Sequence, residues 1–250
     1  MNQERGNMID TNGASVIRGA GALEVGMLLG HYTAECVRPK RGLEDRYEPL
    51  WSRWGAIQNL ADANGRAYTD DERREMLELN LEMWPMADVI WRDVAPNHVC
   101  TEGKNLALDT FLAGSGYTVV GPFLGLISSV SWSATAATDV AAQINGTNGW
   151  KEAGHSARAP EWTTPAADAR RTTNAGWNAA AAGSKALTAA LSFSISTSGT
   201  IKGAFLVYGT GAVATNADTN GKLMSAGVFS GGDKVVANLD TLNVSYSLAF

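Results

Sequence analysis

Residues 187–195 and 242–250 read LTAALSFSI and LNVSYSLAF, and both stretches alternate apolar with small polar side chains. Side chains two positions apart lie on one face of a strand, so each stretch predicts a β-strand with one buried and one solvated face. Residues 119–127, 200–208 and 223–229 predict three further strands that are more uniformly apolar. Short strands separated by glycine-rich turns are typical of an antiparallel β-sandwich or jelly roll, and we expect a mainly β fold of this kind.

Charged residues are concentrated before position 111, where the chain holds 12 of its 20 basic and 18 of its 25 acidic side chains. In this part a helical pattern replaces the strand pattern. Leu50, Trp54, Ile57 and Leu60 recur at spacings of three and four, which places them on one helix face. Asn64-Gly65 provides the stop signal for this first helix.

A second helix is predicted over residues 70–84, with Pro85 closing it. Thr69 and Glu72 have the spacing of a capping box, in which each side chain satisfies a backbone amide that the first turn leaves free. The acidic residues at this helix start also favour the positive end of the helix dipole. The two helices together predict a helical hairpin.

The segments before and after this hairpin have extended character, and we expect residues 29–37 to pair with residues 87–94. The organisation predicted for the chain is therefore an extended N-terminal arm at 1–21, a β domain formed by 22–37 and 87–250, and an inserted helical hairpin at 38–86. A further short helix is expected at about 102–112, capped by Thr101, with Leu108, Phe111 and Leu112 facing inward.

The formal net charge of −5 argues against a general affinity for nucleic acid, which needs basic side chains to displace counterions. No basic-then-apolar signal pattern begins the sequence, and no apolar run reaches the ~18 residues of a membrane span, so we expect a soluble protein made in the cytosol without membrane partners. Cys36 and Cys100 are too few and too far apart to form a disulfide framework or a zinc signature.

No catalytic constellation stands out. His31, His98 and His155 have no partner at metal-ligand spacing. Residues 209–214 match a permissive dinucleotide fingerprint, but a polar loop follows them instead of a helix. The acidic residues at 70–75 are explained by a helix start. We expect no enzyme activity, no cofactor and no metal.

Four tryptophans form the candidate interaction surface: Trp51, Trp54, Trp132 and Trp177. The first two are expected to pack the hairpin, with Trp51 able to reach a partner. The other two lie in glycine- and alanine-rich loops. A loop tryptophan serves either as a stacking platform for a sugar or as an anchor that fixes a long loop to the core, and we favour the anchor.

Three segments, TEGKNLALD at 101–109, GSGYT at 114–118 and FLGLI at 123–127, resemble a pattern found in virion proteins of tailed bacteriophages. The pattern continues in segments 31–35, 148–152, 199–207 and 231–244.

The resemblance implies a β-sandwich or jelly-roll module of the virion, without enzyme activity. Such a protein is assembled in the host cytoplasm as a homo-oligomer, for example a trimer, and binds other virion proteins such as the major capsid protein. A head decoration or cement protein is the first expectation, and a tail, neck or fibre-base protein is the alternative. A carbohydrate-binding β-sandwich is a further alternative. The insertion at 38–86 departs from the pattern, and a specific docking surface could lie there.

Overall fold

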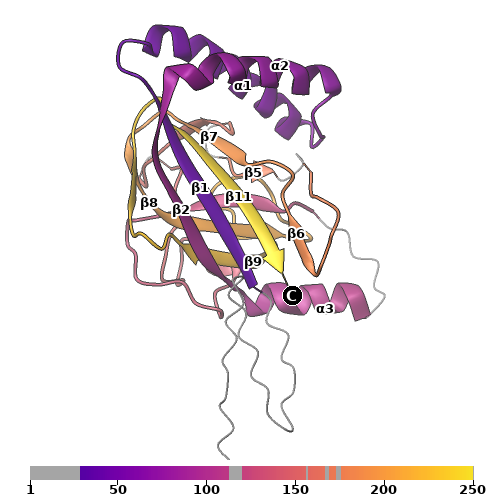
Figure 1. Cartoon of the computed structure of the whole chain (residues 1–250). Helices are drawn as coiled ribbons and strands as arrows, with labels where there is room; N and C mark the ends of the chain where they lie inside the picture. The colour runs from indigo at the N-terminus through magenta and orange to yellow at the C-terminus, as the bar shows by residue number, and fades with distance from the viewer. Residues whose placement is uncertain (1–28, 113–119, 156, 167–168, 173–175, 250) are drawn as a thin grey trace, which may run out of the picture.

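The computed structural model describes residues 29–112, 120–155, 157–166, 169–172 and 176–249. The expected arm at 1–21 lies outside these residues. Eleven strands form one antiparallel sheet that curls on itself, in the order β4-β7-β11-β1-β2-β9-β8-β3-β5, with β10 beside β8 and β6 beside β11 (Figure 1). The predicted mainly β, antiparallel fold is confirmed, and its strands belong to one continuous curled sheet.

The strands are β1 Leu29–Pro39, β2 Ala87–Val99, β3 Phe123–Ser128, β4 Trp162–Thr164, β5 Arg171–Thr172, β6 Ser184–Ala186, β7 Leu191–Ile195, β8 Gly199–Tyr208, β9 Lys222–Val228, β10 Lys234–Val236 and β11 Thr241–Ala249. The helices are α1 Glu44–Ala63, α2 Asp70–Met83 and α3 Thr101–Leu112, with short 3-10 turns at Trp84–Met86 and Ala141–Gln143.

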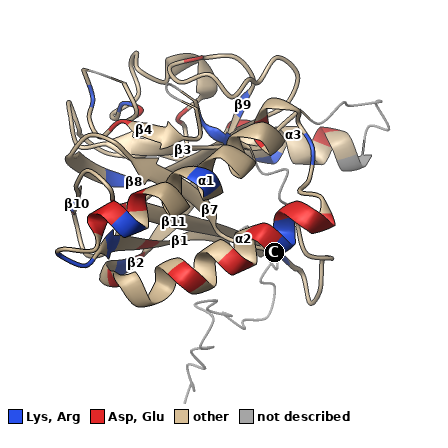
Figure 2. Ribbon diagram, turned by 90° about the horizontal axis from the view of Figure 1, so that it is seen from above, with Lys and Arg blue, Asp and Glu red and all other residues tan. Residues whose placement is uncertain are grey.

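The helical hairpin lies between β1 and β2, as predicted. These two strands pair antiparallel up to Pro39 and Ala87, and the Lys40 amide donates to the Met86 carbonyl at 2.7 Å just beyond them. The capping box of α2 is also confirmed, since the Glu72 amide donates to Thr69 Oγ1 and the Thr69 amide donates to the Glu72 carboxylate. The hairpin lies across one end of the curled sheet (Figures 1 and 2).

Apolar side chains on the inner face of the sheet form two clusters, which include Tyr32 and Phe193 in one and Trp150 and Phe205 in the other. Neither cluster contains a buried residue from the segment 40–86. The hairpin instead has a small cluster of its own, whose buried members are Tyr47, Trp51, Met83 and Met86. The core of the sheet is therefore built without the hairpin.

Apolar and small polar residues were predicted to alternate between a buried and a solvated face in two strands, 187–195 and 242–250. This prediction holds in only one of the two strands. On β11 the apolar Leu242, Val244 and Tyr246 are buried, as predicted. The strand predicted over 187–195 begins only at Leu191, and all five residues of β7 are buried. The prediction of a solvated face on β7 is wrong, because α1 lies close to Ser194 and Ser192 is hydrogen-bonded to Asn243 of β11.

The close approach of α1 to β7 and β4 depends on a glycine. A Cβ atom at Gly55 of α1 would collide with Thr164 Oγ1 and lie 3.8 Å from Ser194 Oγ. Gly55 therefore lets α1 pack directly on the outer side of these strands.

Helix α3 contacts the sheet through its first turn. A Cβ atom at Gly103 would lie 2.8 Å from the Met224 backbone, and the Tyr208 hydroxyl donates to the Gly103 carbonyl at 3.0 Å. Leu108 was expected to face inward, but 55% of its surface is exposed, whereas Gly103 in the first turn is buried against Met224 of β9. The side chains of Phe111 and Leu112 lie outside the described part of the chain.

Candidate functional site: the outer face of the sheet

The outer face of β2, β1 and β11 consists mainly of short polar side chains. Since Val244 of β11 points into the core, its neighbours Asn243 and Ser245 point outward. Ser245 is paired with Thr33 of β1, and Thr33 is paired on its other side with Val94 of β2. These three side chains form a row across three strands in which no side chain is long.

A second row lies two residues further along the strands. Glu35 of β1 stands between Arg92 of β2 and Asn243 of β11, and Asn243 pairs with Ser192 of β7. Arg92 Nε donates to the Glu35 carboxylate, and Ser192 Oγ donates to Asn243 Oδ1 at 2.6 Å. Hydrogen bonds therefore join β2 to β1 and β7 to β11 within this row, and its two charges neutralise each other.

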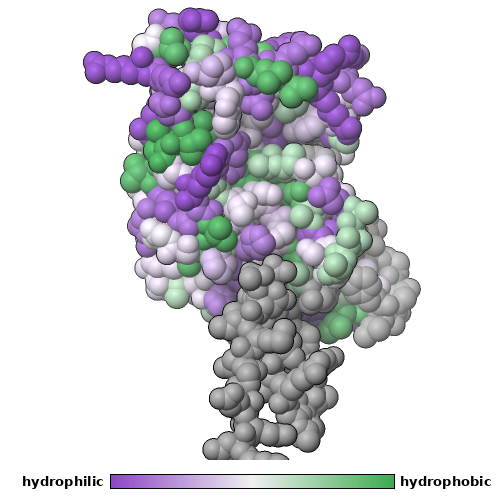
Figure 3. All heavy atoms as spheres, viewed as in Figure 1, coloured by the Kyte–Doolittle hydropathy of each residue, from purple (hydrophilic) through white to green (hydrophobic). Residues whose placement is uncertain are grey.

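An open groove of about 520 Å³ lies over the β2, β1 and β11 residues of these two rows, and Ala34, Asp93 and Ala190 complete its lining. Pale and light purple atoms dominate the middle of this face in Figure 3, as expected for small residues of intermediate hydropathy. The small side chains in its lining, Thr33, Ala34 and Ser245, leave room for side chains of another protein.

Asp93, which lines the groove, has a carboxylate that its neighbours keep ionised. Burial acts to raise the pKa of Asp93, but hydrogen bonds from Lys234 and Ser230 hold that pKa well below its usual range. Lys234 Nζ lies 2.6 Å from Asp93 Oδ2. The groove is therefore lined by paired charges and presents no net charge of either sign from these groups.

The hairpin closes one end of this face. Trp51 Nε1 donates to Thr241 Oγ1 at 2.8 Å, and the Tyr47 hydroxyl lies 3.4 Å from the same oxygen. A cavity of about 50 Å³ remains between the hairpin and the sheet, and Asn243 lines both this cavity and the open groove. The groove and the space under the hairpin therefore meet at Asn243.

The structure brings together only two of the four predicted interaction tryptophans. Trp51 and Trp54 both line the cavity under the hairpin, together with Trp84. Only 6% of the Trp51 surface is exposed, so in the single chain this side chain holds the hairpin on the sheet and is not available to a partner. Trp84, which is 57% exposed, is not among the residues predicted from the sequence to form an interaction surface.

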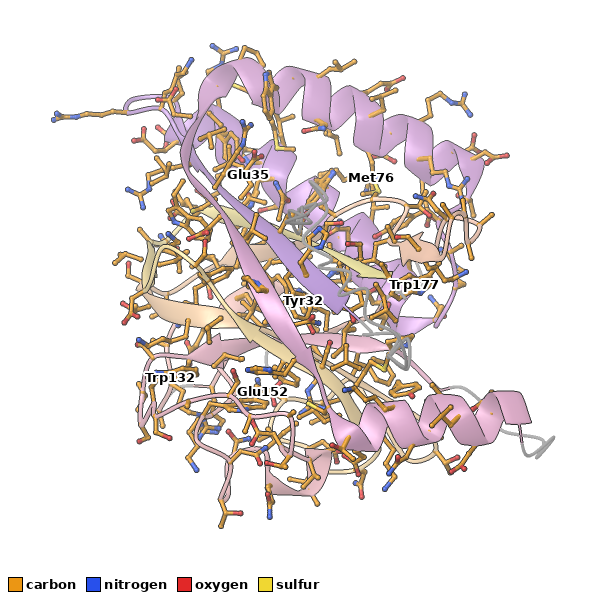
Figure 4. The ribbon with its side chains drawn as sticks, turned by 60° about the horizontal axis from the view of Figure 1, so that its bottom comes forward. Tyr32, Glu35, Met76, Trp132, Glu152 and Trp177 are labelled. Carbon is orange, nitrogen blue, oxygen red and sulfur yellow. The ribbon has the colours of Figure 1, made fainter. Side chains whose placement is uncertain are left out.

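Trp132 and Trp177 lie far from each other (Figure 4). Lys202 Nζ lies 5.3 Å from the Trp132 ring centroid, and Trp177 meets the Tyr246 ring edge-on at 6.2 Å. Both tryptophans are half-buried and pack against core clusters, as expected for loop anchors. Their role in binding stays a prediction.

The fully buried carboxylate of Glu152 belongs to a structural ion pair. Glu152 and Arg170 are fully buried and joined by two hydrogen bonds of 2.7 Å, and the Ala217 amide also donates to Glu152. Burial raises the pKa of Glu152, while Arg170 opposes that shift. Because these partners occupy its oxygens away from solvent, Glu152 stabilises the loop arrangement and is not placed to exchange protons with a substrate (Figure 4).

The two cysteines are free and buried. The Cys36 thiol donates to Asp240 Oδ2 at 3.3 Å. Burial, and to a smaller extent the negative charge of Asp240, raises the pKa of this thiol well above its ordinary value. Burial also raises the pKa of Cys100 to about 12. Both side chains are therefore protonated near neutral pH and unsuited to nucleophilic attack.

The remaining motifs have local structural roles. Residues 209–214 form a turn without a following helix, as predicted for a loop. Within the described residues, no group of three or more His, Cys, Asp or Glu side chains is arranged to hold a metal ion. The described helices include none with the length and apolar character needed to cross a membrane.

Comparisons with known proteins found no matching family model, curated protein or solved structure. The resemblance to virion proteins of tailed phages therefore stays a prediction that rests on the sequence segments alone.

Proposed function

We propose that this chain is a non-catalytic structural protein of a bacteriophage particle, and that it decorates or cements the assembled head. The observation that carries the proposal is the outer face of β2, β1 and β11. Its short Thr33 and Ser245 side chains, its Glu35–Arg92 ion pair and its groove of about 520 Å³ suit close packing against another protein surface.

A cement protein acts by mass action. If the chain binds the assembled lattice and not its separate subunits, each bound copy lowers the free energy of the lattice. Copies arranged around a symmetry axis, for example as a trimer, would repeat the same contact and multiply this effect. The partners proposed are further copies of this chain and the major capsid protein.

Mass spectrometry of purified particles from the phage that encodes this chain tests the proposal. We expect the chain in every particle at a fixed ratio to the major capsid protein. Its absence from particles contradicts the proposal. Copy number separates the head location from the alternative in the tail, neck or fibre base, because head proteins occur in hundreds of copies and tail parts in about 3 to 12.

A pair of surface variants tests whether the outer face is the contact. Thr33→Arg and Ser245→Arg place long charged side chains in the groove, whereas Thr110→Arg places one on the exposed side of α3. We expect the first two variants to fold but to bind particles at least about 10-fold more weakly, and the α3 variant to bind normally. Equal binding by all three contradicts this assignment of the contact face.

A further inference from the structure

Helix α2 exposes an apolar face that nothing in the described chain covers. Of its 14 residues only Met83 is buried. Leu77, Leu81 and the following Trp84 are 59%, 68% and 57% exposed. Their spacings of four and three place the three side chains in one stripe along the helix. A stripe of this kind is the pattern by which a helix packs against a partner.

The stripe ends at a hollow. Trp84, with Asn80 and Met83, lines the cavity of about 50 Å³ between the hairpin and the sheet. Green, apolar atoms appear among the purple ones on the hairpin in Figure 3. A partner side chain that contacts Trp84 can therefore reach into this hollow, while neighbouring apolar side chains rest on the two leucines.

The flank of the stripe is acidic. Helix α2 carries six acidic and two basic side chains, and red segments follow it in Figure 2. The acidic residues of its first half pair with arginines. Glu78 and Glu82, next to the leucines, are exposed and have no ion-pair partner among the described residues. Glu82 also lies in the last turn, where a negative charge opposes the helix dipole.

We propose that the stripe of Leu77, Leu81 and Trp84 binds a basic amphipathic helix of another protein. The apolar side chains of that helix would pack on the two leucines and enter the hollow beside Trp84. Its Lys or Arg side chains would pair with Glu78 and Glu82, as flanking charges do in coiled coils. The α1–α2 hairpin and the bound helix then form a three-helix unit on the surface.

Charge selects this occupant over a second copy of the chain. Two α2 helices brought together would carry net negative charge on both sides of the contact, and like charges at an interface disfavour association. A basic partner neutralises Glu78 and Glu82 and removes the unfavourable interaction of Glu82 with the helix dipole.

The inference deepens the proposed function and rests on it, because it names the chemistry of one partner within the particle. Its test uses the purified full chain and synthetic peptides, whereas the test of the proposed function uses particles. Either can therefore fail while the other succeeds.

The probes are two labelled helical peptides with the same leucine spacing, one flanked by lysines and the other by glutamates. Fluorescence anisotropy with the full chain should show binding of the lysine peptide only, weakening as salt is added. We expect Leu77→Ser/Leu81→Ser to weaken this binding at least about 10-fold. The variant Glu78→Gln/Glu82→Gln, which removes charge without removing apolar contact, should weaken it several-fold and reduce its salt dependence.

Matched controls on α3 are Leu108→Ser, at a leucine of similar exposure, and Asp109→Asn, at an exposed carboxylate. Both should bind the lysine peptide like the native chain. Equal binding of the two peptides, or unchanged binding by both α2 variants, overturns the proposal. So does dimerisation of the native chain that Leu77→Ser/Leu81→Ser abolishes in sedimentation, because the occupant would then be a second copy.

Discussion

Asp62 of α1 and Arg171 of β5 form a buried ion pair with 2.5 Å between Oδ2 and Nη1. Asp62 also accepts a hydrogen bond of 2.6 Å from the Thr172 hydroxyl. One turn earlier on the same helix, Asn59 Nδ2 donates to the Thr163 carbonyl of β4 at 2.9 Å. Because β4 and β5 are the two ends of the strand order, α1 bonds to both ends of the curled sheet.

Removing the carboxylate should destabilise this junction strongly. Arg171 is fully buried, and among the described residues its Nε has no hydrogen-bond partner. Within the same part of the chain, loss of Asp62 leaves its guanidinium only the Tyr68 hydroxyl, 3.4 Å from Nη2. Breaking a buried pair by deleting one partner costs about 3–5 kcal/mol. We expect Asp62→Ala to lower the free energy of unfolding by about 3 kcal/mol in urea denaturation.

The double variant Asp62→Leu/Arg171→Met is the control for this prediction. Burial raises the pKa of Asp62, with Arg171 acting in the opposite direction, so burial of its charge carries an energetic cost. Replacing both partners by apolar side chains should therefore leave stability within about 1 kcal/mol of the native chain. A single variant as stable as the native chain would show that the pair does not hold the junction.

The sequence predicts where the strands lie better than it predicts which segments pack on them. The alternation in LNVSYSLAF correctly gives the buried face of β11, because one side of that strand remains on the surface. The same alternation fails in β7, since α1, more than 120 residues earlier in the chain, packs on its polar side. The hairpin itself was predictable from Thr69 and Glu72, because a capping box is local. Contacts such as Asp62 with Arg171 have no local signal.

Trp51 and Thr241 should be energetically coupled. The hydrogen bond of 2.8 Å between them is buried and joins the hairpin to β11. A buried neutral hydrogen bond contributes about 1 kcal/mol. We expect a double-mutant cycle of Trp51→Phe and Thr241→Val, followed by thermal or urea unfolding, to give a coupling free energy of about 0.5–1.5 kcal/mol. Strictly additive effects would mean that the bond contributes nothing to the seating of the hairpin.

The candidate site was only partly predictable. The alternating Ser and Asn residues of β11 indicate a polar outer face from sequence alone, and Trp51 and Trp54 do lie together. The exposure of the α2 stripe could not be foreseen. Leucines spaced as Leu77 and Leu81 are more often turned to a core, and only the three-dimensional arrangement shows that they point away from it.

The start of α2 should be sensitive to acid. Hydrogen bonds from Arg66, and then from the Thr69 amide, lower the pKa of Glu72 to about 2. A carboxyl whose pKa is lower in the folded state stabilises that state above its unfolded pKa, and the contribution is lost as pH falls from about 4.5 to about 2. We expect stability measured by unfolding to decline through this window, and the decline to be smaller in Glu72→Gln.

Glutamine is the suitable replacement because it can still accept the Thr69 amide but cannot titrate. Glu78→Gln, on the same helix but outside the capping box, should keep the acid transition of the native chain. An unchanged transition in Glu72→Gln would assign it to other carboxylates.

A methyl group at Gly203 should disturb the contact of β8 with β9. A Cβ atom there would overlap the Gly227 carbonyl oxygen and lie 2.8 Å from Val228 Cα, so backbone atoms would have to move. Overpacking of this kind costs about 1–3 kcal/mol. We expect Gly203→Ala to lose stability in this range, whereas Gly146→Ala, whose Cβ would come no closer than 3.4 Å to its neighbours, should lose less.

Replacing residues 40–86 by Asn-Gly should leave a folded β domain. The replaced segment begins and ends where Pro39 pairs with Ala87, and two residues of this type form a tight hairpin turn. Neither sheet cluster includes a buried side chain from the segment, and the β7 residue next to Gly55 of α1 is the polar Ser194. We therefore expect dispersed NMR signals, reduced helical circular dichroism and lower stability from the loss of α1 at the junction of β4 and β5.

The shortened chain should also no longer bind the lysine-flanked peptide. A disordered product would instead mean that the hairpin and the sheet fold as one cooperative unit, with α1 needed to hold the two ends of the sheet together.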